Sequence, residues 1–417
     1  GPTGVELAAE LEELVEKSLD KTTLTQSHFD YYRGGAADEL TLKRNCQAFA
    51  ELSIWPRMLV DISQRDMSLS LAGQAIDMPI VIAPTAFQAL AHNQGEMATA
   101  AAAKQLNTIM TLSTLSNHDI EEVAKAGNHL WYQLYVYKDR AITKDLVARA
   151  EANHYKALVV TVDSPVLGRR ERDIRNQFTL PAGLRAANLE KFALGDIKSN
   201  NSSNQDSDLA SYIASLYDTS LTWKDLEWII SLTKLPVLVK GILRGDDAIK
   251  AVAAGARGII VSNHGGRQLD TTISTIEALP KIILALEKGS HSNSRSEVEV
   301  LLDGGIRRGT DILKALAMGA TWNKKLTEDV AMAVGDETLA AGTMQAWSPV
   351  LDVAQDARWG RCEETFGEDP VLVSQIGGAW IKGYQSKGLF TTPKHFGGHG
   401  APLGGRDSHD IGLSERE

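Results

Sequence analysis

Reactive side chains follow short apolar runs in this chain. Lys240 lies in PVLVKG, His264 follows GIIVSN, and Asp303 lies in VEVLLDGG. A near-neutral imidazole can abstract a proton at physiological pH, and a lysine buried in an apolar strand needs an anionic partner. The full set comprises Ser113, Gln133, Tyr135, Thr161, Asp163, Lys240, Ser262, His264 and Asp303. Their placement predicts one chemical site rather than a series of unrelated turns.

These residues lie at the ends of seven predicted β-strands. The strands cover 78–84, 108–113, 130–136, 157–163, 236–241, 258–263 and 298–305. Each is rich in Val, Ile and Leu and is followed by a turn and a longer helical stretch. The alternation predicts an α/β fold with a buried parallel sheet, either a doubly wound sheet or a (β/α)8 barrel. Both folds place their chemistry at the carboxyl ends of the strands.

The composition excludes several classes of protein. The 417 residues carry 43 Lys and Arg against 53 Asp and Glu, a net charge of -10, so we expect no surface for nucleic acid or anionic lipid. Two cysteines, Cys46 and Cys362, cannot build a disulfide framework and fit a reducing compartment. No apolar run approaches the roughly 20 residues of a membrane span. We expect a cytoplasmic protein without a metal, and the sequence leaves peroxisomal delivery and homo-oligomer formation open.

The rhythm of strands and helices breaks after Gly319, where an eighth strand is due. The pattern instead predicts a helix over 321–342, a strand over 344–353, a helix over 370–385 and a strand over 389–396. Because an open barrel exposes unpaired backbone groups, the strand at 344–353 is a candidate for the eighth position. Earlier in the chain, the polar stretch 198–208 is a candidate lid.

Residues 22–320 resemble the FMN-dependent 2-hydroxy-acid oxidases and dehydrogenases, such as glycolate oxidase and lactate oxidase. The resemblance rests on FDYYRGGAADE, TVDSPVLGRRERDIRN, SNHGGRQLD and LLDGGIRRGTD, which occur in this order. It implies a (β/α)8 TIM-type barrel with FMN over the carboxyl-terminal mouth. It also implies oxidation of L-lactate or glycolate to the 2-oxo acid, with dioxygen reduced to hydrogen peroxide.

The resemblance assigns the catalytic and substrate-binding residues. His264 matches the general base, Asp163 the partner that steadies its imidazolium, and Tyr135 the phenol that binds the substrate hydroxyl. The matching carboxylate-binding residues are Tyr31, Arg170 and Arg267, with Tyr32, Arg169, Arg172 and Arg175 as nearby competitors. A guanidinium fork suits a planar carboxylate.

The resemblance also assigns the cofactor-binding residues. Lys240 matches the lysine beside the N1 and O2 edge of the flavin. The other matches are Ser113, Gln133, Thr161 and Ser262 for the ring and ribityl chain, and Asp303, Gly305 and Arg307 for the ribityl chain and phosphate. The chain departs from the family at Leu115, where a tryptophan is frequent, which implies a wider pocket. The missing eighth unit is the second departure, because the family completes its phosphate clamp there.

Residues 321–417 resemble the N-terminal barrel domain of glycoside hydrolase family 3, the β-glucosidase type. The matching motifs are SPVLDVAQDARWGRCEETFGEDP and KHFGGHGAPLGGRDSHD. The resemblance implies sugar contacts from Arg361, Lys394, His395 and Arg406. Glycoside hydrolysis also needs a nucleophile and an acid, and the nucleophilic aspartate of that family has no counterpart in this sequence.

The first residues, GPTGVELAAEL, resemble the glycine-rich turn of flavin-linked pyridine-nucleotide oxidoreductases. No strand precedes them, so we expect an N-terminal helical segment over 1–21 rather than a dinucleotide site. The leading hypothesis is therefore an FMN-dependent (S)-2-hydroxy-acid oxidase. The alternatives are an incomplete β-glucosidase-like hydrolase and a catalytically inactive fusion.

Overall fold

The structure is a computed structural model, and only part of the chain can be described. The described residues are 24–54, 59, 63–192, 216–289, 298–320, 324–354, 359, 361, 364–366, 370–395 and 400. The predicted N-terminal helix over 1–21, the candidate lid at 198–208 and Arg406 lie outside them. The chain divides into two compact units, Gly1–Leu316 and Ala317–Glu417, which are described separately.

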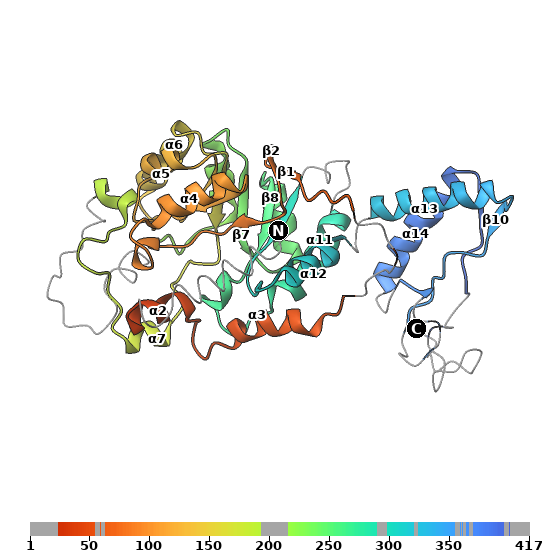
Figure 1. The fold of residues 1–417 in the computed structure, drawn as a ribbon, viewed down its shortest axis with the longest axis horizontal. Coiled ribbons are helices and arrows are strands. Elements are labelled where there is room, and N and C mark those ends of the chain that lie inside the picture. Colours follow the sequence, from red (N-terminus) through yellow and green to blue (C-terminus); the bar gives the residue numbers. More distant parts are fainter. Residues whose placement is uncertain are drawn as a thin grey trace. The chain divides into compact units, whose positions relative to one another are not determined.

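A parallel sheet of seven strands forms the centre of the first unit (Figure 1). Its strands are β3 (Val81–Ile82), β4 (Ile109–Leu112), β5 (His129–Leu134), β6 (Ala157–Thr161), β7 (Val237–Ile242), β8 (Gly258–Val261) and β9 (Glu299–Leu302). All seven fall within the predicted runs or overlap them. The five inner strands are almost wholly buried, as their runs of Val, Ile and Leu predict.

Strand order decides between the two folds that the sequence allowed. Neighbouring strands in the sheet are consecutive in the chain from β3 to β9, without the reversal of order that marks a doubly wound sheet. Parallel pairing throughout, with helices between successive strands, is the topology of a TIM-type α/β fold. The fold class is therefore confirmed at the level of a seven-stranded TIM-type sheet.

The expected eighth strand is not part of this sheet. The predicted strand over 344–353 shortens to β10 (Gln345–Ala346), and β10 pairs with β11 (Phe390–Thr391) in a separate parallel sheet of two strands. Among the described residues, no strand pairs with the outer edges of β3 and β9. The described strands thus do not show residues 344–353 in the eighth position, which stays a prediction.

Helices link successive strands and flank the sheet. Their bounds are α2 (Gln26–Arg33), α3 (Leu40–Glu51), α4 (Gly95–Gln105), α5 (Ile120–Ala126), α6 (Arg140–Ala152), α7 (Glu171–Arg175), α9 (Trp223–Ser231), α10 (Gly245–Ala253), α11 (Thr275–Gly289) and α12 (Gly309–Ala320), with 3-10 turns η1 (Gln88–Leu90), η2 (Ala187–Phe192) and η3 (His264–Gly266). Local sequence fixes several starts. Asp119 and Glu122 form a capping box at α5, and Thr222 and Asp225 form one at α9. None of the described helices is long and apolar enough to cross a membrane.

A short hairpin covers the amino ends of the strands. It consists of β1 (Leu69–Leu71) and β2 (Gln74–Ile76), and its apolar residues pack on a core that includes Trp131, Val159 and Leu238. Glu299, the first residue of β9, accepts a hydrogen bond from the backbone N–H of Ala72 at 2.6 Å. The amino end of the sheet is therefore closed, which leaves the carboxyl ends for a site.

The second unit has its own small core. Helices α13 (Lys324–Ala340) and α14 (Pro370–Ser386) pack together and flank β10 and β11. Ala331, Tyr384 and Leu389 form the buried cluster between them. The two predicted helices and two predicted strands of this region are all present, although both strands are only two residues long.

Glu96 at the start of α4 ties together two loops that follow β3 and β4. Its carboxylate is fully buried, accepts the backbone N–H groups of Gln88 and Asn117 at 3.1 Å each, and lies 2.9 Å from His118 Nδ1. Both backbone N–H groups bind the same oxygen, Oε1, and the other oxygen, Oε2, faces the imidazole of His118. The carboxylate therefore anchors both loops.

We expect Glu96→Gln to lower the free energy of unfolding by about 1–3 kcal/mol, because an amide that keeps its oxygen on the two backbone N–H groups turns its own N–H toward His118 Nδ1 and removes the acceptor there. Urea unfolding followed by circular dichroism measures this change. Glu227→Gln makes the same chemical change on the exposed side of α9 and should leave the midpoint unchanged. Equal midpoints for the two variants would contradict the anchoring role.

Candidate functional site

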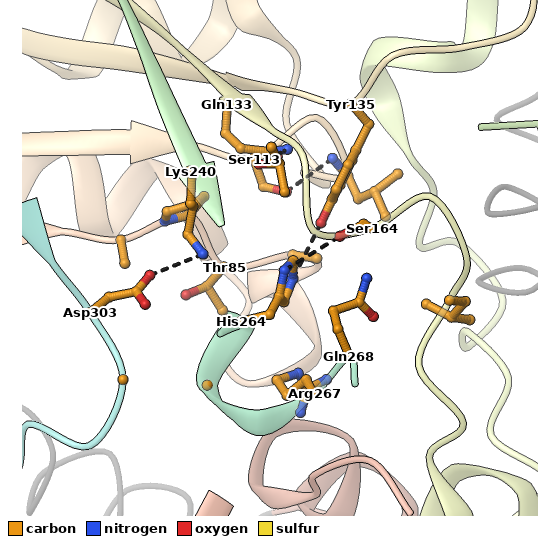
Figure 2. A pocket seen from close by; sticks show the side chains of 18 of the residues that line it. Thr85, Ser113, Gln133, Tyr135, Ser164, Lys240, His264, Arg267, Gln268 and Asp303 are labelled. Atoms are coloured by element: carbon orange, nitrogen blue, oxygen red, sulfur yellow. Dashed lines mark hydrogen bonds and ion pairs between the residues drawn. The ribbon is translucent and has the colours of Figure 1, made fainter. Parts of the chain in front are cut away.

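A cavity of about 300 Å³ opens at the carboxyl ends of the parallel strands (Figure 2). The predicted site residues that line it are Tyr31, Ser113, Gln133, Tyr135, Thr161, Arg170, Lys240, His264, Arg267 and Asp303. They come from strands or loops more than 200 residues apart in the chain. The fold thus brings together most of the residues that the sequence singled out.

His264 lies between a carboxylate and a phenol. Its Nδ1 is 2.8 Å from Asp163 Oδ1 and 3.4 Å from Ser164 Oγ, and its Nε2 is 3.5 Å from the Tyr135 hydroxyl. Figure 2 shows Tyr135 and Ser164 converging on the imidazole from the strand ends. Asp163 does not line the cavity itself; its carboxylate contacts two lining residues, His264 and Ser164, whose hydroxyl donates to Oδ1 at 2.8 Å.

The turn that carries His264 explains the sequence SNHGG. His264 has a left-handed φ of 59°, and its backbone N–H donates to Ser262 Oγ at 3.0 Å. The Asn263 side chain accepts the N–H of Gly266 and exchanges two hydrogen bonds with Asn45 on α3, at 2.9 and 2.7 Å. A Cβ on Gly266 would lie 2.6 Å from the backbone nitrogen of Leu42. The turn therefore needs glycine and holds the imidazole rigidly.

Electrostatics keep the histidine neutral and its partner charged. Burial lowers the pKa of His264 below its ordinary value, against the opposing pull of the Asp163 charge. Burial alone would raise the pKa of Asp163, but the charge and hydrogen bond of His264, with the charge of Lys240, hold it at about 2. A neutral imidazole that faces a carboxylate carries its proton on Nδ1, so Nε2 has a free lone pair. His264 can therefore accept a proton at Nε2.

Two arginines bring positive charge into the same cavity. Arg267 Nη1 donates to the backbone carbonyls of Gly34 and Tyr32, at 2.6 and 3.3 Å. Arg170 lies 3.8 Å from Asp173, and its buried Nε has no hydrogen-bond partner. Both guanidinium groups face the ring of Tyr31, with centroid distances of 6.0 Å for Arg170 and 5.3 Å for Arg267.

The arginine pair favours an anion between or beside the two groups. Burial, followed by the charge of Arg170, lowers the pKa of Arg267 to about 10, which still leaves it charged near pH 7. Two like charges in a buried site repel each other, and an anionic ligand relieves that repulsion. A planar carboxylate offers the matching geometry.

Lys240, near the carboxyl end of β7, belongs to a second group of polar side chains. Its ammonium, on a side chain that is 6% exposed, donates to Ser262 Oγ at 2.7 Å and lies 3.0 Å from Asp303 Oδ2. Burial alone would lower the pKa of Lys240, but the charges of Asp303 and Asp163 raise it. Asp303 Oδ1 is buried without a partner. Lys240 is thus a fixed cation next to an acceptor that still lacks a donor.

Gln133 supports the floor of the cavity. Its Oε1 accepts the backbone N–H of Thr114 at 3.1 Å, and its Nε2 donates to Thr161 Oγ1 at 3.0 Å. Ser113 Oγ accepts the N–H of Leu115 at 3.1 Å. These bonds fix the positions of the polar side chains at the ends of β4, β5 and β6.

Three of the predicted cofactor residues lie outside the lining. Ser262 is fully buried and contacts Lys240 and the N–H of His264. Gly305 has a φ of 90°, and a Cβ there would come within 2.3 Å of the Asn45 carbonyl oxygen. Arg307 donates from Nη1 to the carbonyl of Ile306, and its backbone N–H donates to Asp311 Oδ2 at 3.0 Å.

Sequence reasoning missed several lining residues. Tyr217 stacks on Tyr135 with ring centroids 4.7 Å apart, and Gln268 accepts the N–H of Gly168 at 2.8 Å. Thr85, in the loop after β3, and Ser164 also line the cavity. The signal for Ser164 and Gln268 was present, because they adjoin predicted site residues in TVDSP and GGRQLD. Tyr217 carried no such signal.

The second unit brings together some of the predicted sugar contacts. Arg361 Nη1 lies 3.1 Å from His395 Nε2, and Asp352 Oδ2 lies 2.8 Å from His395 Nδ1. Arg361 also makes two hydrogen bonds with Glu364, at 2.7 and 2.8 Å. The backbone of Lys394 forms a bridge with Val350. Among the described residues, no group of His, Cys, Asp and Glu could hold a metal.

Comparisons with known proteins agree with the sequence motifs. The family model described as FMN-dependent dehydrogenase matches residues 20–322, and the glycosyl hydrolase family 3 N-terminal domain model matches residues 294–414. An L-lactate oxidase from a Nostoc species is 52% identical over 73% of this chain and 82% of its own length. Human 2-hydroxyacid oxidase 1 is 50% identical over 72% of this chain and 79% of its own length.

Solved structures agree as well. A mandelate oxidase with (S)-4-hydroxymandelic acid matches with a TM-score of 0.67 and 40% identity, over 73% of this chain and 82% of the other. A lactate oxidase from Pediococcus acidilactici matches with a TM-score of 0.65 and 37% identity, over 74% of this chain and 79% of the other.

Proposed function

The chain belongs to the FMN-dependent dehydrogenase family, and we propose that it oxidises a small (S)-2-hydroxy acid, L-lactate or glycolate, to the 2-oxo acid. Dioxygen takes up the two electrons and two protons and becomes hydrogen peroxide. The observation that carries the proposal is the neutral His264 in one cavity with two buried arginines. Proton removal and carboxylate binding are the two tasks that this reaction sets the protein.

The substrate carboxylate binds at Arg170, Arg267 and Tyr31. Support comes from the buried Nε of Arg170, which has no hydrogen-bond partner, and from the position of both guanidinium groups near the Tyr31 ring. A bidentate guanidinium contact also orients the acid, which places its C2 carbon in a defined position.

The substrate loses a proton to His264 Nε2. Asp163 holds Nδ1 and stabilises the imidazolium that forms, and Tyr135 donates a hydrogen bond at the substrate hydroxyl. The Nε2 atom of His264 faces the Tyr135 hydroxyl, so the base and the phenol can contact neighbouring atoms of the same substrate. Asp163 is a positioning residue in this scheme because it does not line the cavity.

The residues of the cavity fit FMN. When bound, FMN supplies the two-electron acceptor for the oxidation. Lys240 suits the ring edge that gains negative charge, and the unpartnered Asp303 Oδ1 suits a ribityl hydroxyl. The further contacts we propose are Ser113, Gln133, Thr161 and Ser262 for the ring and ribityl chain, and Gly305 and Arg307 for the phosphate.

The domain boundaries remain those that the motifs suggest: 1–21, an oxidase barrel over 22–320, and a family 3-like segment over 321–417. Support comes from the two family matches and from the division of the chain near residue 316. The family 3-like segment follows β9 and α12 where the eighth unit of the barrel is due, so we propose that it replaces that unit in the sequence. The two-cysteine composition supports a reducing compartment such as the cytoplasm.

A flavin spectrum tests the function directly. The purified protein, supplied with FMN, should show flavin absorbance that L-lactate or glycolate bleaches without oxygen and that returns with air as hydrogen peroxide forms. Absence of bleaching with FMN bound would contradict the oxidase function. Absence of FMN binding would favour an inactive fusion, and release of an aryl glucoside's chromophore would favour the hydrolase.

The pH dependence should follow from the pair His264 and Asp163. Activity requires neutral His264, so kcat/KM should rise with pH through the lowered pKa of that imidazole. Asp163→Asn removes the charge that raises this pKa, so the acid limb should move to lower pH. The maximal kcat should fall at least about tenfold, because the imidazolium loses its partner. A pH series of peroxide formation measures both effects.

Ser164→Ala serves as the control for that series. The Ser164 hydroxyl lies 3.4 Å from the same nitrogen but carries no charge. The variant should leave the acid limb in place. A limb that stays fixed, or moves to higher pH, in Asp163→Asn would show that the carboxylate does not govern the base.

A further inference from the structure

Tyr217 is a buried aromatic residue that the proposed reaction leaves without a role. It is 5% exposed and lines the same cavity as His264, Arg170 and Arg267. Its ring stacks on Tyr135 at 4.7 Å between centroids and 23° between planes. Tyr135 in turn reaches His264 Nε2 with its hydroxyl. Tyr217 therefore covers one face of the phenol that stands next to the base.

The backbone holds Tyr217 firmly in this position. Tyr217 forms an antiparallel bridge with Tyr137, and the residues on both sides of it bond to the chain that continues β5. Lys138 N–H donates to Leu216 O, and Asp218 N–H donates to Val136 O, each at 2.9 Å. The edge of the Tyr217 ring also meets Tyr137 at 5.5 Å and 70°. A stacked and T-shaped pair of contacts leaves the ring little freedom.

A charged network fixes the next residue. The Asp218 carboxylate accepts Arg140 Nη2 at 2.6 Å and the N–H of Ser220 at 2.8 Å. Arg140 also binds Asp225 on α9 at 2.7 Å. The segment that delivers Tyr217 is thus tied to α6 and α9, so the ring forms a rigid wall rather than an adaptable one.

We propose that Tyr217 is a specificity-determining residue whose ring reserves the space beside Tyr135 and so limits the C2 substituent of the 2-hydroxy acid to hydrogen or methyl. The inference rests on the proposed function. An aryl substituent needs a volume close to that of the Tyr217 ring. The side-chain contacts of Tyr217 with Tyr135 and Tyr137 are ring contacts, so the ring, rather than the hydroxyl, carries the effect.

Substrate preference in three variants tests this role. Tyr217→Ala and Tyr217→Leu remove the ring, and Tyr217→Phe keeps it without the hydroxyl. Anaerobic flavin bleaching gives kcat/KM for (S)-mandelate and for L-lactate in each variant and in the starting protein. (S)-Mandelate carries at C2 the aryl substituent that the Tyr217 ring should exclude, whereas L-lactate carries a methyl group. Circular dichroism and FMN binding confirm folding, and the leucine variant retains apolar bulk should alanine fail to fold.

The ratio of mandelate to lactate kcat/KM should rise at least about tenfold in Tyr217→Leu and Tyr217→Ala and stay within about threefold in Tyr217→Phe. In the ring-free variants KM for mandelate should fall while kcat for lactate also declines, because Tyr135 loses its stacking partner. Unchanged ratios without the ring, or a starting protein that already prefers mandelate, would overturn the specificity role and leave the oxidase function intact. Absence of bleaching by every 2-hydroxy acid would instead overturn the function, and this inference with it.

Discussion

Replacement of His264 by alanine should lower the rate of substrate-dependent flavin bleaching by about 10²-fold to 10⁴-fold, the usual contribution of a general base. The physical reason is that no other described side chain offers a lone pair next to the Tyr135 hydroxyl. Nε2 of His264 lies 3.5 Å from that hydroxyl, while Asp163 holds the opposite nitrogen. Flavin absorbance before substrate addition should remain, because FMN binding depends on other residues. Stopped-flow absorbance under nitrogen measures the rate.

Backbone strain needs a matched control in this experiment. His264 has a left-handed φ of 59°, and exposed His154 has a φ of 62°. His154→Ala therefore imposes the same strain far from the proposed chemistry and should leave bleaching unchanged. His264→Asn tolerates the left-handed backbone better than alanine and should be as slow as His264→Ala. Bleaching at the normal rate in either His264 variant would remove the imidazole from the mechanism.

The strand ends were predictable because each buried strand of a parallel sheet appears in the sequence as a run of apolar residues. The inner strands are mostly apolar, and a polar residue near the end of the strand, such as Thr161 or Lys240, lies at the carboxyl edge of the sheet. Convergence of the strand ends then follows from topology alone. Assignment of His264 as a base needed the family resemblance in addition, since a lone histidine is usually structural.

Other features depended on contacts between distant residues. The hairpin at residues 69–76 is short and polar in part, so periodicity did not reveal it. Tyr217 enters the cavity only because its backbone pairs with Tyr137, 80 positions earlier. The pairing of β10 with β11 was equally hidden, because a strand of two residues carries no pattern that names its partner. These failures share one cause, which is that pairing partners are chosen by tertiary structure.

Replacement of Arg170 by methionine should lower kcat/KM for L-lactate by roughly 100-fold, chiefly through KM. A buried hydrogen-bonded charge pair that loses one partner costs about 2–5 kcal/mol, and roughly 1.4 kcal/mol corresponds to tenfold. The Nε of Arg170 is buried without a partner, and its nearest carboxylate, Asp173, is 3.8 Å away. Its donors are therefore available to a substrate carboxylate, whereas Arg267 Nη1 already binds two backbone carbonyls. Removal of Arg170 therefore disturbs fewer hydrogen bonds within the protein than removal of Arg267 would.

Two comparisons separate carboxylate recognition from general damage. Arg169→Met removes the neighbouring arginine, whose side chain is 69% exposed and pairs with Glu171, and should change KM less than about threefold. L-lactamide, which lacks the negative charge, should be a poor ligand of the unaltered protein, and Arg170→Met should narrow the preference for lactate over lactamide. An equal loss of affinity for L-lactate and L-lactamide would mean that Arg170 shapes the cavity but does not recognise the negative charge of the carboxylate. Burial, followed by the charge of Arg170, lowers the pKa of Arg267, so that pKa should rise when Arg170 is removed. Arg267 therefore stays charged and supplies the residual binding.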